Sequence, residues 1–241
     1  MSKKVSFFPR DMVVSQVVQS PKPSREYMPD WFKNMGASWK DNEGFLRAGP
    51  TKCMPFLDSF TSGYIHELAV DVEIISIGKD PKTKKDMIRY RWGDIPGSKI
   101  KPIITRQHEN GAPPSLPHFP GYYDIEFQWY TMWDAETPKG YSTIYHHPNN
   151  RFDLPFQTFS GIIDTDSWHG PGPIPFLLKE GFTGVIPAGT PIIQFTFVKR
   201  ENWVSKKEDF DLDKKIKHDS SVKKYFQGGY KKEHWVKKEF K

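Results

Sequence analysis

The sequence has a single cysteine, Cys53, among 241 residues. A disulfide within the chain is therefore excluded, which is typical of proteins that fold in a reducing compartment. Cys53 lies among apolar residues in TKCMPFLD, and no base that could activate it as a nucleophile can be identified nearby. We therefore interpret Cys53 as a small buried hydrophobic residue.

Long apolar runs are also missing, since none approaches the roughly 20 residues that a membrane-spanning helix needs. Mean hydropathy is −0.66, and 27% of the residues are charged. The apolar stretch near the start is interrupted by Pro9, Arg10 and Asp11, which argues against a secretory signal. The sequence thus predicts a soluble chain without a membrane partner, located in the cytoplasm.

The net charge of +6 is concentrated near the end of the sequence. Residues 204–241 contain twelve lysines against seven acidic residues, a net charge of +5, which leaves about +1 for the rest of the chain. A lysine-rich tail can bind phosphate groups, membrane headgroups or an acidic partner. A solvated surface is the simpler interpretation of the same pattern.

Short apolar segments separated by glycine and proline turns predict an all-β fold, a barrel or a sandwich. The segment YIHELAVDVEIISI alternates from Leu68 onward, and MIRYRWG, YYDIEFQWYTMWD and YSTIYHHP predict further strands. Residues 93–121 are rich in proline and are predicted to form a surface loop. The pattern therefore favours antiparallel strands over alternating strands and helices.

Composition divides the chain into three segments. Residues 1–50 resemble an irregular N-terminal arm with a short helix over MPDWFKNMG. Residues 51–203 form the β-rich core, and residues 204–241 form a basic tail of one or two amphipathic helices interrupted at Gly228-Gly229.

The order of motifs from Pro138 to Arg200 resembles the dUTPase and dCTP deaminase superfamily. PKGYSTIYHHP is followed by SGIIDTDSWHG and then by PFLLKEGFTGVIPAGTPIIQFTF. Residues 161–166 match the start of the family's acidic hairpin, and Gln194 lies in its later strand motif. The resemblance implies a distorted β-barrel of the β-clip type and a homotrimer with sites between subunits. It also leads us to expect that residues 160–197 form one bent β-hairpin unit whose acidic loop faces a cleft.

The same resemblance implies a nucleotide site. Asp164 would be the base that orients a water toward a magnesium-bound triphosphate, and Trp168 would be a flat wall for the sugar. A tight Asp-rich turn that only joins two strands is the alternative interpretation. The other nucleotide-binding candidates are Asp166, Gln194, His147, Asn149 and Arg151.

Three departures from the family pattern weigh against catalysis. The phosphate-binding turn of the family carries Arg-Ser, whereas this chain has His146-His147-Pro148-Asn149. Arginine binds phosphate in a bidentate manner that histidine and asparagine cannot reproduce. The dCTP deaminases carry a glutamate in the strand after the hairpin, and the only counterpart here, Glu180, comes too late in the sequence. The dUTPases end in a glycine-rich arm that closes over the phosphates, and only residues 227–229 resemble it here.

The adjacent histidines raise the question of a metal site. Neighbouring residues on a strand point to opposite faces, so His146 and His147 cannot easily bind one ion together. One of them would need His169 and a carboxylate such as Asp164 or Asp166. Two half-buried imidazoles bonded to the backbone are the simpler prediction, and we assign no metal residues.

Other segments, WFKNMG, KCMPFLDSFTSGY and GYKKEHWVKKEF, resemble an uncharacterised family of proteins from marine cyanophages and bacteria. The leading hypothesis is a phage-type accessory or structural protein that uses a dUTPase-like fold as a binding and assembly module. Its partner would be a phage or host protein, or a nucleotide, in the host cytoplasm or the virion. The alternative is a divergent Mg²⁺-dependent deoxynucleoside triphosphate hydrolase or a dCTP deaminase-like enzyme. A third hypothesis is a nucleic-acid binder.

Overall fold

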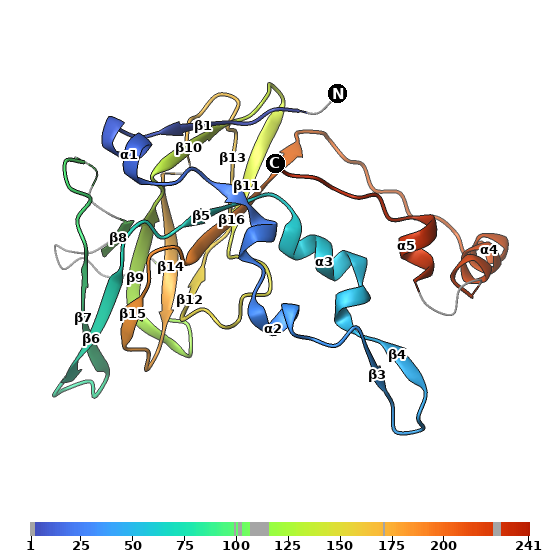
Figure 1. The fold of residues 1–241 in the computed structure, drawn as a ribbon, viewed down its shortest axis with the longest axis horizontal. Helices are drawn as coiled ribbons and strands as arrows, with labels where there is room; N and C mark the ends of the chain where they lie inside the picture. Colours follow the sequence, from blue (N-terminus) through green and yellow to red (C-terminus); the bar gives the residue numbers. More distant parts are fainter. Residues whose placement is uncertain (1–2, 99, 101–102, 107–115, 171, 224–227) are drawn as a thin grey trace. The chain divides into compact units, whose positions relative to one another are not determined.

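The computed structural model describes residues 3–98, 100, 103–106, 116–170, 172–223 and 228–241 (Figure 1). Strands predominate over helices in it, which confirms the all-β prediction. The chain forms two compact units that are interleaved in sequence: Met1–Lys22 with Gly63–Arg200, here called the strand unit, and Pro23–Ser62 with Glu201–Lys241, the helical unit. The three-segment division of the sequence stays a prediction.

The strand unit consists almost entirely of short strands, with one helix, α1 (Met12–Val17), near its start. The short strand β2 (Lys22–Pro23) lies where the chain passes into the helical unit. The remaining strands are β1 (Ser6–Pro9), β5 (Tyr64–Glu67), β6 (Val72–Lys79), β7 (Asp86–Trp92), β8 (Ile103–Arg106), β9 (Tyr122–Tyr130), β10 (Trp133–Glu136), β11 (Tyr141–His146), β12 (Phe156–Thr158), β13 (Gly161–Ile163), β14 (Pro173–Lys179), β15 (Gly184–Ile186) and β16 (Pro191–Lys199).

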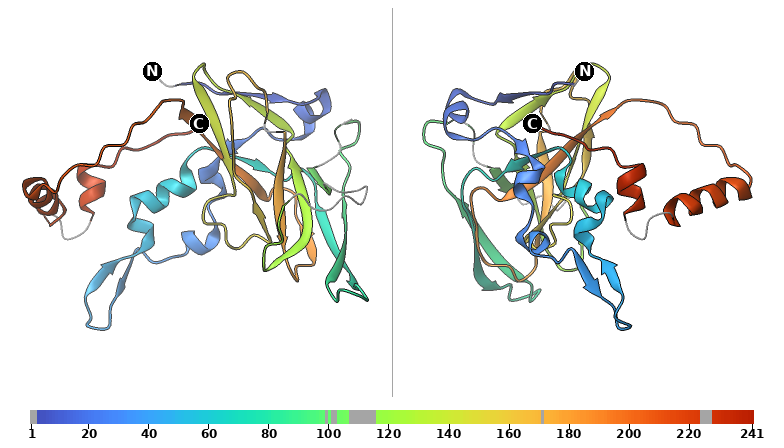
Figure 2. Two further views of the ribbon diagram at one scale, coloured as in Figure 1. Left: turned by 180° about the vertical axis from the view of Figure 1, so that it is seen from behind. Right: turned by 45° about the vertical axis from the view of Figure 1, so that its right-hand side comes forward.

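These strands form four separate sheets (Figures 1 and 2). A five-stranded sheet has the order β13-β11-β16-β5-β2, and a four-stranded sheet has the order β12-β14-β9-β8. A three-stranded sheet, β15-β6-β7, and the pair β1-β10 complete the unit. Among the described residues the strands do not close into a barrel, so the expected barrel is not found.

Alternation predicted several strands correctly, but not all of their ends. Leu68, Val72 and Ile74 are buried, as their spacing indicated. The predicted continuous strand is nevertheless interrupted at residues 68–71, because β5 pairs with β16 whereas β6 pairs with β7 and β15. The loop prediction for residues 93–121 is wrong at Ile103–Arg106, which form β8; residues 107–115 lie outside the described residues.

The expectation that residues 160–197 form one hairpin unit is wrong. β13 pairs with β11 in the five-stranded sheet, whereas β14 pairs with β9 and β12 in the four-stranded sheet. β15 belongs to the three-stranded sheet. Each strand thus pairs with a segment that is distant in sequence, a choice that local motif order does not specify.

Aromatic side chains fill the core of the strand unit. The rings of Trp129 and Phe176 are stacked with centroids 3.7 Å apart, and Phe156 packs edge-on against Trp129. The Trp129 indole donates a 3.0 Å hydrogen bond to the Thr158 hydroxyl, which donates a 2.8 Å bond to the Ile192 carbonyl. Because Ile192 lies in β16, this chain of bonds links the four-stranded and five-stranded sheets.

The helical unit has its own aromatic core. Phe32, Phe56 and Phe60 pack against one another with ring centroids 4.6 to 5.5 Å apart. Helix α2 lies in the segment where the sequence predicted a short helix. The elements of the unit are η1 (Ser24–Tyr27), α2 (Asp30–Lys33), β3 (Ser38–Lys40), β4 (Leu46–Ala48), η2 (Pro50–Lys52), α3 (Met54–Thr61), α4 (Leu212–Lys223) and α5 (Gly229–Glu233).

Two contacts fasten the last residues of the chain to α3. The Trp235 indole donates a 3.0 Å hydrogen bond to Asp58, and the Lys238 ammonium group donates one of 2.6 Å to the same oxygen. Cys53, at the N-terminal end of α3, is exposed, so the prediction that it is buried is wrong. No helix in the described part of the chain is long and apolar enough to cross a membrane.

Candidate functional site

The acidic turn after β13 is anchored by Thr165, which is completely buried. Its hydroxyl shares hydrogen bonds with the Thr137 hydroxyl, at 2.9 Å, and with the Thr143 hydroxyl, at 2.7 Å. The Trp168 N–H donates a 2.9 Å bond to the Asp164 carbonyl, which closes the turn. Thr165 is directed inward, whereas the side chain of the neighbouring Asp164 is 59% exposed.

Asp166 is held by the chain itself. Its carboxylate accepts a 2.7 Å hydrogen bond from the Gly140 N–H, and two nitrogens of the Arg200 guanidinium donate to its two oxygens. Its side chain is only 5% exposed. The bonds from Arg200 and from the Gly140 N–H lower the pKa of Asp166 to about 2. The nucleotide-binding role predicted for Asp166 therefore has to compete with a strong internal partner.

Asp164 is more accessible, with its side chain 59% exposed. One oxygen accepts a 2.6 Å hydrogen bond from the Ser142 hydroxyl and lies 3.2 Å from the Arg200 guanidinium. The other oxygen has no partner among the described residues. Trp168, the predicted sugar wall, is 67% exposed on the same turn. The turn thus has one accessible carboxylate oxygen, and the other oxygen of the same group is held by Ser142 and Arg200.

Arg200 is the residue of this group that sequence reasoning missed. It also donates to the Tyr141 carbonyl, at 3.1 Å, and its own N–H donates to the Gly140 carbonyl at 2.9 Å. It therefore joins the end of β16, the start of β11 and the acidic turn. The sequence feature that could have identified Arg200 is its position directly after FTFVK, at the end of a strand that pairs with β11.

The turn that follows β11 contains three of the nucleotide-binding candidates, His147, Asn149 and Arg151. His147 accepts a 3.2 Å hydrogen bond from the Thr158 N–H at Nδ1, so its Nε2 carries the proton and donates to the Arg151 carbonyl. His146 donates from Nδ1 to the His147 carbonyl at 2.7 Å. Burial lowers the pKa of His147 to about 4 and also lowers that of His146. Both rings are half-buried, neutral at pH 7 and bonded to the backbone, which agrees with the structural prediction for them.

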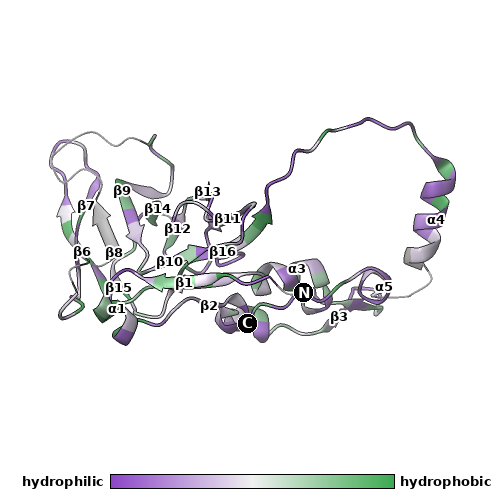
Figure 3. Cartoon of the chain, turned by 90° about the horizontal axis from the view of Figure 1, so that it is seen from above, coloured by the Kyte–Doolittle hydropathy of each residue, from purple (hydrophilic) through white to green (hydrophobic). Residues whose placement is uncertain are grey.

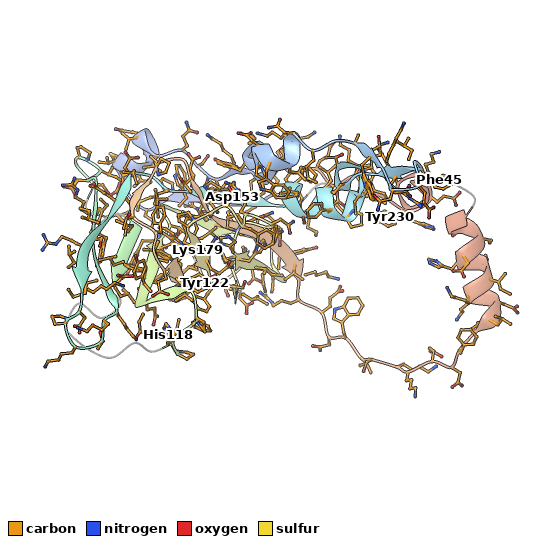
Figure 4. The ribbon with its side chains drawn as sticks, turned by 90° about the horizontal axis from the view of Figure 1, so that it is seen from below. Phe45, His118, Tyr122, Asp153, Lys179 and Tyr230 are labelled. Carbon is orange, nitrogen blue, oxygen red and sulfur yellow. The ribbon has the colours of Figure 1, made fainter. Side chains whose placement is uncertain are left out.

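The remaining nucleotide-binding candidates near this turn also have partners within the chain. The side-chain oxygen of Gln194, a buried residue, accepts a 2.8 Å bond from the Asn149 N–H. Arg151 forms a bidentate ion pair with Asp153, at 2.7 to 3.1 Å (Asp153 is labelled in Figure 4). This turn and Ser160 border a shallow depression of about 280 Å³.

The acidic turn and the histidine turn lie at opposite ends of β11. Ser142 contacts the acidic turn near the start of the strand, whereas His146 is its last residue. Four residues of strand correspond to about 13 Å. The structure therefore does not bring Asp164 and His147 together in one chain's site. Four depressions stand out among the described residues, and Asp164 borders none of them.

The described residues do not provide a metal site. No three side chains of His, Cys, Asp or Glu in this part of the chain are grouped so that they could hold an ion. At the acidic turn, Arg200 already occupies the position beside both carboxylates that a cation would take. The residues present therefore do not fit a protein-bound Mg²⁺.

Comparison of the chain with protein-family models gives no match, and comparison with curated proteins gives none either.

Proposed function

We propose that this chain is a non-catalytic binding and assembly module, in the role of a phage-type accessory or structural protein. One observation carries the proposal. The polar side chains in the positions of a dUTPase-like site are engaged by the chain itself: Asp166 by Arg200, His147 by two backbone groups and Gln194 by the Asn149 N–H. Side chains in such bonds stabilise the fold and are not free to bind a triphosphate.

A second feature supports a binding role. The two-stranded hairpin β3-β4 is exposed on both faces, with Trp39, Phe45 and Leu46 among its exposed side chains (Phe45 is labelled in Figure 4). Its loop is organised by Asp41, which accepts bonds from the Phe45 N–H and from Arg47. Isolated hairpins are marginally stable, and exposed aromatic groups of this kind are enriched at protein interfaces.

The fold type is part of the proposal. We infer a divergent relative of the dUTPase-type β-clip. Its support is the antiparallel pairing of β11 with both β13 and β16, which joins the first two motifs of the resemblance and the last strand of the third in one sheet.

A divergent deoxynucleoside triphosphate hydrolase is the second candidate. The accessible Asp164 oxygen and the exposed Trp168 on the same turn favour it. Because the chain offers no metal ligands there, any Mg²⁺ would be held mainly by the nucleotide's phosphates.

Turnover measurements separate the two candidates. The purified chain is incubated with dUTP and with dCTP in the presence of Mg²⁺, and pyrophosphate and ammonia are measured. We expect neither product, and no thermal shift with either nucleotide. Product formation that Asp164→Asn abolishes, while the exposed control Asp30→Asn retains it, would establish the hydrolase or deaminase instead.

A further inference from the structure

Residues 201–213, here called the acidic arm, are the most exposed apolar segment of the helical unit. Within the described chain, no backbone group from Asn202 to Phe210 takes part in a backbone hydrogen bond. Residues 201–211 form neither helix nor strand, and the last two residues of the arm begin α4 (Figure 3). Trp203 is 87% exposed, Val204 95% and Phe210 80%. Large apolar groups on an extended backbone are typical of a segment that is covered by a partner.

The charges of this region are divided between two parts. The acidic arm has five carboxylates and two lysines, a net charge of −3. Residues 214–223 and 228–241, here called the basic tail, have nine lysines and three carboxylates, a net charge of +6. Exposed apolar side chains occur in the basic tail as well: Ile216, Tyr230 and Val236 (Tyr230 is labelled in Figure 4). The two parts are therefore complementary in charge and both contribute apolar surface.

We propose that the acidic arm of one copy of this chain binds the basic tail of a second copy, and that the exchange is reciprocal. The inference rests on the proposed function and names the partner that the assembly module takes. In a two-fold dimer the same contact forms twice. A chain that carries both an acidic and a basic part can therefore pair each part with the opposite part of its partner. The arm does not fold onto its own tail, although the two are consecutive in sequence, since its aromatic side chains are almost completely exposed.

The length of the arm is sufficient for the exchange. The nine residues from Asn202 to Phe210 can span up to about 30 Å when extended. Ion pairs across such an interface are screened by salt, whereas the apolar contacts are not. We therefore expect a dimer that weakens, but does not disappear, as the salt concentration rises.

Sedimentation velocity on the full chain tests the apolar contribution. We expect a concentration-dependent dimer whose dissociation constant rises roughly tenfold or more in the variant with Trp203→Ala and Phe210→Ala. Phe152→Ala is the matched control, because Phe152 is 79% exposed but lies in the strand unit. Since all three residues are on the surface, the fold is retained, which circular dichroism checks. Equal weakening by the control would overturn the proposal.

Charge reversal distinguishes exchange between copies from contact within one chain. One variant carries Glu208→Lys and Asp209→Lys, which bring the arm to +1, and the other carries Lys215→Glu, Lys217→Glu, Lys231→Glu and Lys237→Glu, which bring the tail to −2. Each variant alone then has an arm and a tail of like charge and is expected to lose the dimer. An equimolar mixture regains it, because the arm of each variant is opposite in charge to the tail of the other. Contact within a chain would leave the mixture as monomeric as its components, which contradicts the exchange.

A monomeric wild-type chain at every concentration would also overturn the exchange. That result leaves the proposed function standing, because turnover of dUTP or dCTP tests it independently. Conversely, product formation together with a dimer of the expected variant behaviour would refute the non-catalytic role and support the exchange.

Discussion

At the residue scale, the bonds to Asp166 account for much of the local order. Its carboxylate joins the Gly140 N–H to the Arg200 guanidinium, and Arg200 in turn holds Asp164. The same guanidinium that fixes the turn reduces the capacity of Asp166 to accept a proton. One arginine thus determines both how the turn is built and why Asp166 is a poor general base.

This role of Arg200 predicts a measurable pKa. Asp166 should titrate with a pKa of about 2, below its ordinary value of 3.8. Because the pKa is lower in the folded chain, the ionised carboxylate stabilises the fold above pH 3.8, and this contribution is lost as the pH falls from 3.8 to about 2. Arg200→Ala should raise the Asp166 pKa toward 3.8 and flatten the loss of stability in that window. NMR titration of the carboxyl group and urea unfolding at several pH values measure the two effects.

Arg89→Ala is the control for this prediction, since Arg89 is an exposed arginine on β7. It should leave the Asp166 titration unchanged. A wild-type Asp166 that titrates near 3.8 would contradict the proposed effect of Arg200.

Sequence reasoning identified the acidic turn through its resemblance to a hairpin motif, but not the partner of its carboxylates. Arg200 follows Asp166 by 34 residues, and only the register of β16 against β11 brings it to the turn. The burial of Cys53 was inferred from apolar neighbours in the sequence, yet Cys53 lies at the exposed start of α3. Both cases depend on tertiary structure that a local pattern does not contain.

At the element scale, alternation predicted strands wherever one face of the strand is buried. β7 and β11 lie where the sequence patterns placed strands. Partner choice was not predictable in the same way: β13 and β14 are ten residues apart, but they belong to different sheets. Pairing depends on which distant strand offers a complementary face and register, so the order of motifs alone could not specify it.

The close approach of β5 and β16 predicts a sensitive glycine. Gly63 precedes β5 with a φ of +81°, and a Cβ there would overlap the Phe195 carbonyl oxygen. We expect Gly63→Ala to lower the free energy of unfolding by about 3 kcal/mol, from the left-handed backbone and the overlap together. Gly189 is the matched control, since its φ is +82° and no atom lies within 4 Å of the added carbon. Gly189→Ala should cost about 1 kcal/mol.

Urea unfolding of the two variants measures this difference. Equal losses of stability would show that the backbone conformation alone matters, and that β5 and β16 can separate slightly to accept a methyl group. A larger loss for Gly63→Ala would confirm that their spacing is fixed.

At the scale of the whole molecule, the two compact units are interleaved in sequence. The chain enters the helical unit at residue 23, leaves it at residue 62 and returns to it at residue 201. Residues 1–22 belong with strands more than a hundred positions later, as the ion pair of Arg10 with Asp134 illustrates. A boundary set by such long-range pairing has no local signature in the sequence.

Limited proteolysis tests directly whether the acidic arm is exposed. Trypsin should cut first after Lys206 or Lys207, because the arm is exposed there and no backbone hydrogen bond from Asn202 to Phe210 has to open before cleavage. The turn between β6 and β7, with Lys82 and Lys84, is the internal comparison, since Asp80 accepts bonds from two N–H groups of that turn. Mass spectrometry of the first fragments identifies the site.

If arms are exchanged between copies, cleavage in the arm should slow as the protein concentration rises, while cleavage in the turn does not. A first cut at the turn would contradict the exposure of the arm, and protection that does not depend on concentration would contradict its exchange.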